Sequence, residues 1–190
     1  MIDESGIHGS SRQIFLAFAL FGAVGGSLVA APGLDGVLGA FLAALTLAIA
    51  IIDSGRYIIP NELTGAALAL ALLRAGAAGP DADWRAMAVA AIRAACVTVP
   101  FLALMSGYRR WRGRDGLGLG DVKLAAVAGA WLSLVTVFAV IELATLSALG
   151  AYVVSGAINK RPLKATAFLP FGLFLAPAIW IGWLIEVLLS

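Results

Sequence analysis

The sequence predicts an all-α, polytopic transmembrane bundle of about seven helices that forms one domain over residues 1–190. Of these 190 residues 62% are hydrophobic and only 13% are charged, whereas soluble domains carry about 25% charged residues. The mean hydropathy is +0.99, and the apolar residues fall into runs close to the ~20 residues that cross a bilayer as a helix. The strand alternation of a membrane β-barrel is absent. The net charge of +2 gives no indication of nucleic-acid binding.

The first apolar run is expected to stay as a membrane anchor. The residues before it include Asp3, Glu4 and only Arg12, which makes a poor signal peptide. Almost no loop separates the fifth run from the sixth, and we expect the break between them near Phe138. The predicted spans, in chain order, are 13–31, 34–53, 62–79, 86–106, 122–138, 139–158 and 166–189.

The basic residues predict a cytoplasmic N-terminus, because loops on that side of a membrane carry the excess of Lys and Arg. This orientation leaves three arginines on or near the outer side, namely Arg74, Arg85 and Arg93. Ten basic residues then lie inside: Arg12, Arg56, Arg109, Arg110, Arg112, Arg114, Lys123, Lys160, Arg161 and Lys164. The largest loop, Gly107 to Gly120, holds several of them. It is a topology determinant among lipid headgroups and can also steer a substrate.

Two carboxylates stand at ends of spans on the predicted cytoplasmic face. Asp53 ends one apolar run, and Asp121 begins another after Gly118 and Gly120. Each has an ordinary explanation, since Asp53 can pair with Arg56 at headgroup level and Asp121 can be a common helix cap. Acids at membrane depth are nevertheless usually functional. We therefore expect an acid–base pair.

Two acids in one site hold a single proton between them, because the second charge is costly beside the first. The ionised partner can activate water, and the protonated one can polarise a peptide carbonyl and then protonate the leaving amine. This chemistry needs no metal, cofactor, serine or cysteine nucleophile. His8 lies in a polar tail, and Cys96 lies in an apolar run as a small packing residue.

The motifs together resemble the type IV prepilin peptidase family. That family has an Asp at the end of a span followed by Ile/Leu-Pro-Asn/Asp-x-Leu-Thr, and here Asp53 precedes the stretch Ile59 to Thr64. Within that stretch Pro60 ends the loop and Asn61 can cap the next helix. The family pattern Gly-x-Gly-Asp-x-Lys-Leu corresponds to 118–124, and Gly-Ala-Trp-Leu to 129–132. A late Pro-Phe-Gly-Pro-Phe-Leu pattern matches 170–175, except that Leu173 replaces its proline.

The resemblance implies an aspartic endopeptidase with Asp53 and Asp121 as its catalytic dyad. It further implies a multi-pass enzyme in the cytoplasmic (inner) membrane of a prokaryote, which removes the basic leader of a prepilin at the cytoplasmic face. Its partners are that prepilin and the lipid bilayer. Lys123 can pair with Asp121 or with a lipid phosphate. The supporting residues implied are Gly118, Gly120, Lys123, Pro60, Asn61, Pro170, Phe171 and Gly172.

The larger members of that family carry a cytoplasmic insertion with paired Cys-x-x-Cys motifs and methylate the new N-terminus. This sequence has one cysteine and no such insertion, so it resembles the short forms that serve Flp/Tad-type pili. We expect neither a bound zinc, a methyl donor nor methyltransferase activity. The oligomeric state is unknown from sequence.

Three other interpretations stay open. An intramembrane protease of the presenilin or signal-peptide-peptidase kind shares Gly-x-Gly-Asp, but usually has Tyr-Asp and Pro-Ala-Leu motifs that are absent here. A small proton-coupled transporter could use the two acids as a relay, although it would predict an internal repeat and broken helices. A third interpretation is a non-catalytic assembly protein with the same fold.

Overall fold

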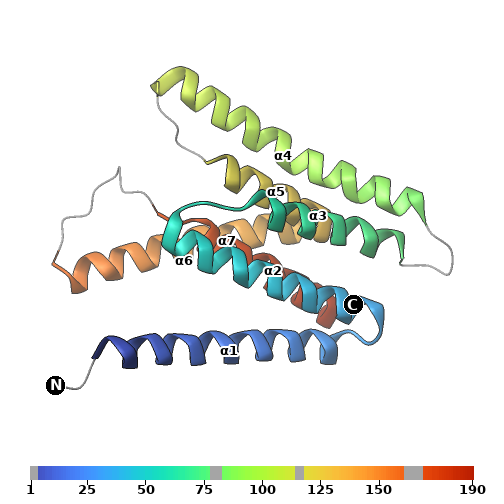
Figure 1. Cartoon of the computed structure of the whole chain (residues 1–190). Coiled ribbons are helices and arrows are strands. Elements are labelled where there is room, and N and C mark those ends of the chain that lie inside the picture. Colours follow the sequence, from blue (N-terminus) through green and yellow to red (C-terminus); the bar gives the residue numbers. More distant parts are fainter. Residues whose placement is uncertain (1–3, 78–82, 114–117, 161–168) are drawn as a thin grey trace.

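The computed structural model describes residues 4–77, 83–113, 118–160 and 169–190. Within these ranges the chain is helical, as predicted, and its seven helices run alternately between two ends of a bundle (Figure 1). Five helices are long and apolar enough to cross a membrane. These are α1 (Glu4–Ala30), α2 (Leu34–Arg56), α4 (Trp84–Arg112), α6 (Leu134–Ile158) and α7 (Gly172–Leu189). The polytopic helical prediction is confirmed.

The two shorter helices, α3 (Asn61–Gly76) and α5 (Leu119–Trp131), lie inside the assembly. Figure 1 shows them between α4 and the group formed by α2, α6 and α7, while α1 packs along α2 at the far side. α5 contacts α3, α4 and α7, and eight of its residues are buried. The N-terminus of this buried helix carries Asp121, so the packing of α5 positions one of the predicted site residues.

The core is built around two tryptophans in the C-terminal halves of α5 and α7. Trp131 and Trp183 are fully buried and meet edge to face, with ring centroids 6.4 Å apart. The indole N–H of Trp131 donates to the carbonyl of Ala67 at 2.9 Å. Gly39 lets α2 approach α7, because a Cβ at this position would lie 1.9 Å from the Trp183 ring. These contacts hold α2, α3, α5 and α7 together.

The break between α5 and α6 corrects the predicted one near Phe138. α5 ends at Trp131 and α6 begins at Leu134, so Phe138 lies inside α6. Ser133 is the N-cap, and its hydroxyl accepts from the backbone N–H of Thr136. The Glu186 carboxylate accepts from the backbone N–H of Ser133 at 2.7 Å. Residue counting placed the break too late because it ignored this Ser cap signal.

Two other local predictions are also corrected. The predicted loop from Gly107 to Gly120 is shorter, because α4 continues to Arg112 and α5 begins at Leu119; positions 114–117 lie outside the described residues. Asn61 does not cap α3. Pro60 occupies the N-cap position, and no side chain makes a capping bond there. Proline suits the start of a helix because its missing N–H is not needed there.

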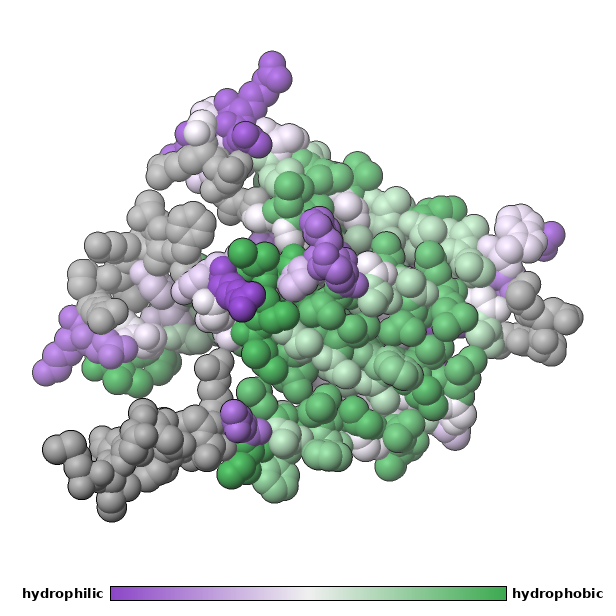
Figure 2. Space-filling model, viewed as in Figure 1, coloured by the Kyte–Doolittle hydropathy of each residue, from purple (hydrophilic) through white to green (hydrophobic). Residues whose placement is uncertain are grey.

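The surface has the distribution of a membrane protein. In Figure 2 hydrophobic residues cover most of the visible face of the helices, and the hydrophilic ones gather largely toward the two ends of the bundle. Large exposed apolar side chains occur on several helices, including Phe18, Val89 and Val135. Such a surface is unfavourable in water and is favoured in a hydrocarbon environment.

Candidate active site

Asp53 lies in the last turn of α2, where the chain is about to leave the helix. Its own carbonyl accepts from the N–H of Tyr57 at 2.9 Å, and Tyr57 has the left-handed conformation (φ 55°) that ends α2. The Asp53 residue is only 4% exposed. A carboxylate near the C-terminus of its own helix faces the negative end of the helix dipole. Asp53 therefore needs donors from elsewhere.

The N-terminus of α7 supplies these donors. The backbone N–H of Leu173 donates to Asp53 Oδ2 at 3.0 Å. Gly172 lies directly against the same carboxylate, since a Cβ at this glycine would be 2.9 Å from Oδ2. The free N–H groups and the positive dipole end of a helix N-terminus favour an anion. The start of α7 therefore compensates for the unfavourable end of α2.

Asp121 occupies the first turn of α5, two residues beyond its first residue, and is half-buried. The N-cap is Gly118, where a Cβ would lie 3.3 Å from Asp121 Oδ2. The prediction placed Asp121 at or near the cap, and it is in the first turn rather than at the cap itself. The carboxylate thus folds back toward the glycine turn that precedes α5.

The charge of Asp53 acts on Asp121. Asp121 belongs to α5, which is not one of the five helices long and apolar enough to cross a membrane. Burial is the largest cause that raises the pKa of Asp121, from 3.8 to about 6, and the charge of Asp53 raises it further. The backbone of Gly118 offsets part of this increase in the pKa. The structure therefore brings Asp53 and Asp121, 68 positions apart in the sequence, to the same end of the bundle.

Ile59 occupies the space between the helices that carry the site. Its side chain is 9% exposed and lies against both Gly120 of α5 and Gly172 of α7. A Cβ would come within 2.9 Å of Ile59 Cβ at Gly120 and within 2.8 Å of Ile59 Cδ1 at Gly172. Both glycines are therefore required for close approach. The motif around Pro60 packs directly beside the acids.

The predicted supporting residues fall at this same end. Lys123 Nζ donates a short hydrogen bond to Asn61 Oδ1 and so links the start of α5 with the start of α3. This bond differs from both pairings considered for Lys123 from sequence. The carbonyls of Pro170 and Phe171 accept from backbone N–H groups in the first turn of α7, at 3.2 Å from Leu173 and 3.0 Å from Phe174. They shape the helix start that meets Asp53.

Sequence reasoning missed two contributors. Ile59 was part of a motif but had no assigned role, and its contacts with Gly120 and Gly172 arise only from the packing of the helices. Leu173 was noted only as a departure from a proline. Its significance is that leucine, unlike proline, keeps the backbone N–H that Asp53 accepts from. Long-range contacts of this kind cannot be read from local sequence.

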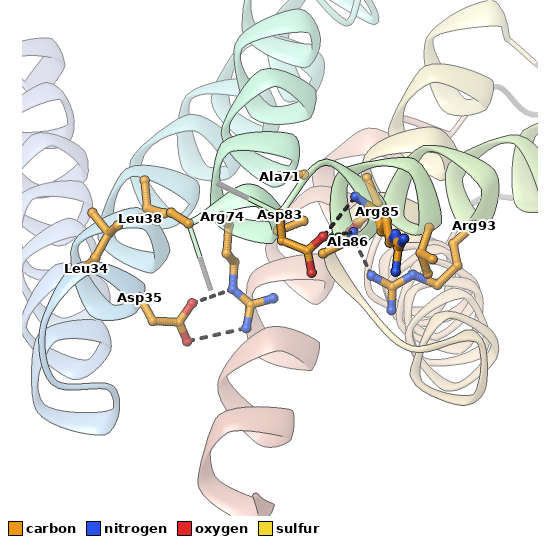
Figure 3. Close-up of a pocket in the computed structure, with 13 residues that line it drawn as sticks. Leu34, Asp35, Leu38, Ala71, Arg74, Asp83, Arg85, Ala86 and Arg93 are labelled. Atoms are coloured by element: carbon orange, nitrogen blue, oxygen red, sulfur yellow. Dashed lines mark hydrogen bonds and ion pairs between the residues drawn. The ribbon is translucent and has the colours of Figure 1, made fainter. Parts of the chain in front are cut away.

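A hollow of about 700 Å³ lies at the other end of the bundle. Figure 3 shows its polar lining, in which Asp35 of α2 pairs with Arg74 of α3. Asp35 precedes Asp53 by 18 residues, or about 27 Å along a helix. This hollow is therefore separate from the acid pair. Among the described residues, no three His, Cys, Asp or Glu side chains group so as to hold a metal ion.

Comparison with known proteins matches residues 40–154 to the sequence profile of the type IV leader peptidase family. A prepilin leader peptidase/N-methyltransferase of Aeromonas hydrophila is 31% identical over 163 residues, covering 82% of this chain and 52% of that relative. The leader peptidase HopD of Escherichia coli is 34% identical over 143 residues, covering 74% of this chain and 88% of HopD. A prepilin leader peptidase/N-methyltransferase of Burkholderia pseudomallei is 34% identical over 164 residues, covering 84% and 47%. The chain thus spans about half the length of these two bifunctional relatives. No solved structure matches it.

Proposed function

The chain belongs to the type IV leader peptidase family, and from this premise we propose that it is a membrane-embedded aspartic endopeptidase for prepilins. Asp53 and Asp121 would be its catalytic dyad. The enzyme would sit in the cytoplasmic membrane of a prokaryote with its N-terminus and both acids on the cytoplasmic side. It would remove the basic leader of a prepilin whose apolar helix lies beside it in the bilayer.

One observation carries this proposal: two carboxylates from distant parts of the chain lie at the same end of an apolar bundle, near enough to interact electrostatically. The charge of Asp53 raises the pKa of Asp121, and Ile59 lies against Gly120 at the start of α5 and Gly172 at the start of α7. Placing acids in such apolar surroundings is costly in free energy, and acids that are kept there are usually functional. Nearby carboxylates that titrate apart are typical of acid–base sites.

The arrangement suits hydrolysis of an amide bond. The ionised acid accepts a proton from water as the water attacks the peptide carbonyl carbon, and the protonated acid donates a hydrogen bond to the carbonyl oxygen. The tetrahedral intermediate then breaks its C–N bond, and a proton from the pair goes to the leaving amine. Half-burial of Asp121 reduces its exposure to bulk water, which strengthens these interactions.

Among prepilins, we propose the Flp/Tad type as the substrate class. The support for it is the resemblance to short family members, the single cysteine in 190 residues, and a length comparable with that of HopD, 88% of which is covered. On this proposal the reaction ends with peptide hydrolysis, without methylation of the new N-terminus.

The test uses the purified chain reconstituted in phospholipid vesicles with a full-length Flp-type prepilin. A prepilin that a leader peptidase/N-methyltransferase processes is tested in parallel as the second substrate. Mass spectrometry of the products should show one cut between the basic leader and the apolar helix of the Flp-type substrate. A prepilin that stays intact while the vesicles take up protons under a pH gradient would instead favour the transporter interpretation. Cleavage of only the second substrate would contradict the Flp/Tad assignment and leave the peptidase proposal standing.

A further inference from the structure

The two acids differ in the donors that meet them. Asp53 is 4% exposed, and its Oδ2 atom accepts from the backbone N–H of Leu173 at 3.0 Å. The same N–H also faces the carbonyl of Pro170 at 3.2 Å, within the turn that starts α7. A backbone amide can only donate, so Oδ2 must offer a lone pair. A buried carboxylate is tolerated in its charged form when such donors satisfy it.

We propose that the main-chain amide of Leu173 is a positioning group that holds Asp53 as the ionised member of the pair. On this assignment Asp53 activates the water, and Asp121 keeps the shared proton and passes it on. The inference rests on the proposed function and deepens it by giving the two acids separate roles. The amide also fixes Oδ2 against α7, which leaves Oδ1 as the atom that can accept the proton from water.

The surroundings of Asp121 agree with this division. Asp121 is half-buried with Asp53 as its charged neighbour, and both effects favour its protonated form. Lys123, two positions further along α5, is engaged by Asn61 Oδ1, so its hydrogen bond goes to the start of α3. The backbone of Gly118 has the opposite effect and lowers the pKa of Asp121. Asp53 therefore accepts a hydrogen bond from the start of α7. Asp121 is instead repelled by the charge of Asp53.

Other charged groups also lie near this end of the bundle. Arg56 and Glu62 are exposed, at the end of α2 and the start of α3. The helix that supplies the amide, α7, has Glu186 near its opposite end. The described side chains of α1, which packs on α2, run from 13 to 30 and include no titratable group. These groups are the same in Leu173→Pro and Leu173→Ala, so their influence cancels when those two variants are compared below.

The direct experiment titrates each acid alone. Aspartate carboxyls are labelled with ¹³C, and the remaining acid is followed by NMR or infrared spectroscopy in detergent micelles. In Asp121→Asn the Asp53 carboxyl should ionise at a lower pH than the Asp121 carboxyl does in Asp53→Asn. The opposite order, or coincident titrations, would overturn the assignment. This readout does not depend on peptidase activity, so failure of the proposed function would be seen separately.

A second experiment removes the amide itself. Leu173→Pro deletes the N–H in the first turn of α7, where proline is tolerated, and Leu173→Ala keeps the N–H while shortening the side chain. The acidic limb of the pH–rate profile for a prepilin that the wild-type chain cleaves should move upward by about one pH unit in Leu173→Pro. Leu173→Ala should keep the wild-type limb. Equal shifts in both variants, or a folded Leu173→Pro with no shift, would contradict the role of the amide; if Leu173→Pro fails to fold, the titration decides.

Discussion

Asp53 has an unusual electrostatic position, because the C-terminal end of α2 disfavours its charge and the N-terminal end of α7 favours it. The hydrogen bond from Leu173 and the contact with Gly172 join these two helix ends at one carboxylate. Asp121 is the complementary case, with a favourable position at the start of its own helix α5 and a burial that opposes its charge. The two side chains are chemically identical, and the helix ends and the burial around each one make their electrostatic surroundings different.

The raised pKa of Asp121 predicts a pH dependence of stability. The pKa rises from 3.8 to about 6 on folding, so the folded state binds this proton more tightly than the unfolded state does. Its contribution is fully present below about pH 4 and is lost as the pH rises through about 6. The melting temperature in detergent should therefore fall by about 5 °C across this window.

Thermal unfolding from pH 4 to pH 7 checks this dependence. Asp121→Asn should flatten the curve, whereas Glu62→Gln, which alters an exposed acid at the same end, should keep the wild-type slope. A slope of opposite sign, or one that survives in Asp121→Asn, would show that another group is responsible.

Gly172→Ala should reduce peptidase activity at least about 100-fold with a small effect on folding. The added Cβ would lie 2.9 Å from Asp53 Oδ2 and 2.8 Å from Ile59 Cδ1, so the carboxylate must move, and small displacements of reacting groups are costly. The control is Gly65→Ala in α3, where nothing lies within 4 Å of the new atom and alanine should slightly stabilise the helix. Cleavage rates and melting temperatures of both variants measure the effect, and full activity in Gly172→Ala would remove the glycine from the account.

At this scale the sequence predicted both acids and the motifs around them, because charges in apolar runs are conspicuous. It did not predict the partners of individual side chains. Lys123 was expected near Asp121 or a lipid phosphate, but it donates to Asn61 across 62 positions. The packing of α3 against α5 decides which residues become partners, and no local sequence pattern encodes that packing.

Among the elements, α5 is exceptional because it is short, buried and ends inside the bundle. Its last carbonyls need donors, since lipid offers none. Two arginines supply them: Arg74 Nη1 donates to Trp131 at 3.3 Å and Arg93 Nη2 to Ala130 at 3.4 Å. Arg74 also pairs with Asp35 and lies over the Trp131 ring. Arg74 and Arg93, which the sequence predicts on or near the outer side, therefore have structural partners.

Arg74→Leu should destabilise the protein by about 1–3 kcal/mol, because it leaves the Trp131 carbonyl and Asp35 without their donor. Arg85→Leu is the matched control, since Arg85 is exposed and contacts the ring of its neighbour Trp84, a contact worth about 0.5–1 kcal/mol. Denaturant or thermal unfolding in detergent measures both. Equal losses in the two variants would contradict the capping role of Arg74.

Helix boundaries show the limit of sequence reasoning at this scale. Hydropathy located the apolar runs because burial in lipid requires them, but it divided 122–158 at the wrong place. The division follows from the cap at Ser133, supported by Glu186 from α7. α4 likewise extends into a basic stretch as far as Arg112. Its C-terminal arginines stabilise this end, because positive charges interact favourably with the negative end of the helix dipole.

For the whole molecule, alternation of seven helices places the starts of α3, α5 and α7 and the end of α2 together (Figure 1). The sequence predicted that the two acids share one face from the even number of spans between them; the structure has two helices there, α3 and α4, of which only α4 is long and apolar enough to cross a membrane. Opposite the converging helix ends, the hollow lined by Asp35 and Arg74 occupies the other end. The chemistry that we propose is therefore concentrated at one membrane face, which suits a substrate whose leader and apolar helix meet at that face.

The most direct test of the central claim is leader removal from a co-expressed prepilin, measured by the mass of the pilin in Asp53→Asn and Asp121→Asn. Asparagine keeps the size and shape of each side chain and removes its ability to exchange a proton. We predict that both variants insert into the membrane at wild-type levels and leave the prepilin uncleaved, while Glu62→Gln processes it normally. Complete processing by either asparagine variant would contradict the claim that these two acids act together.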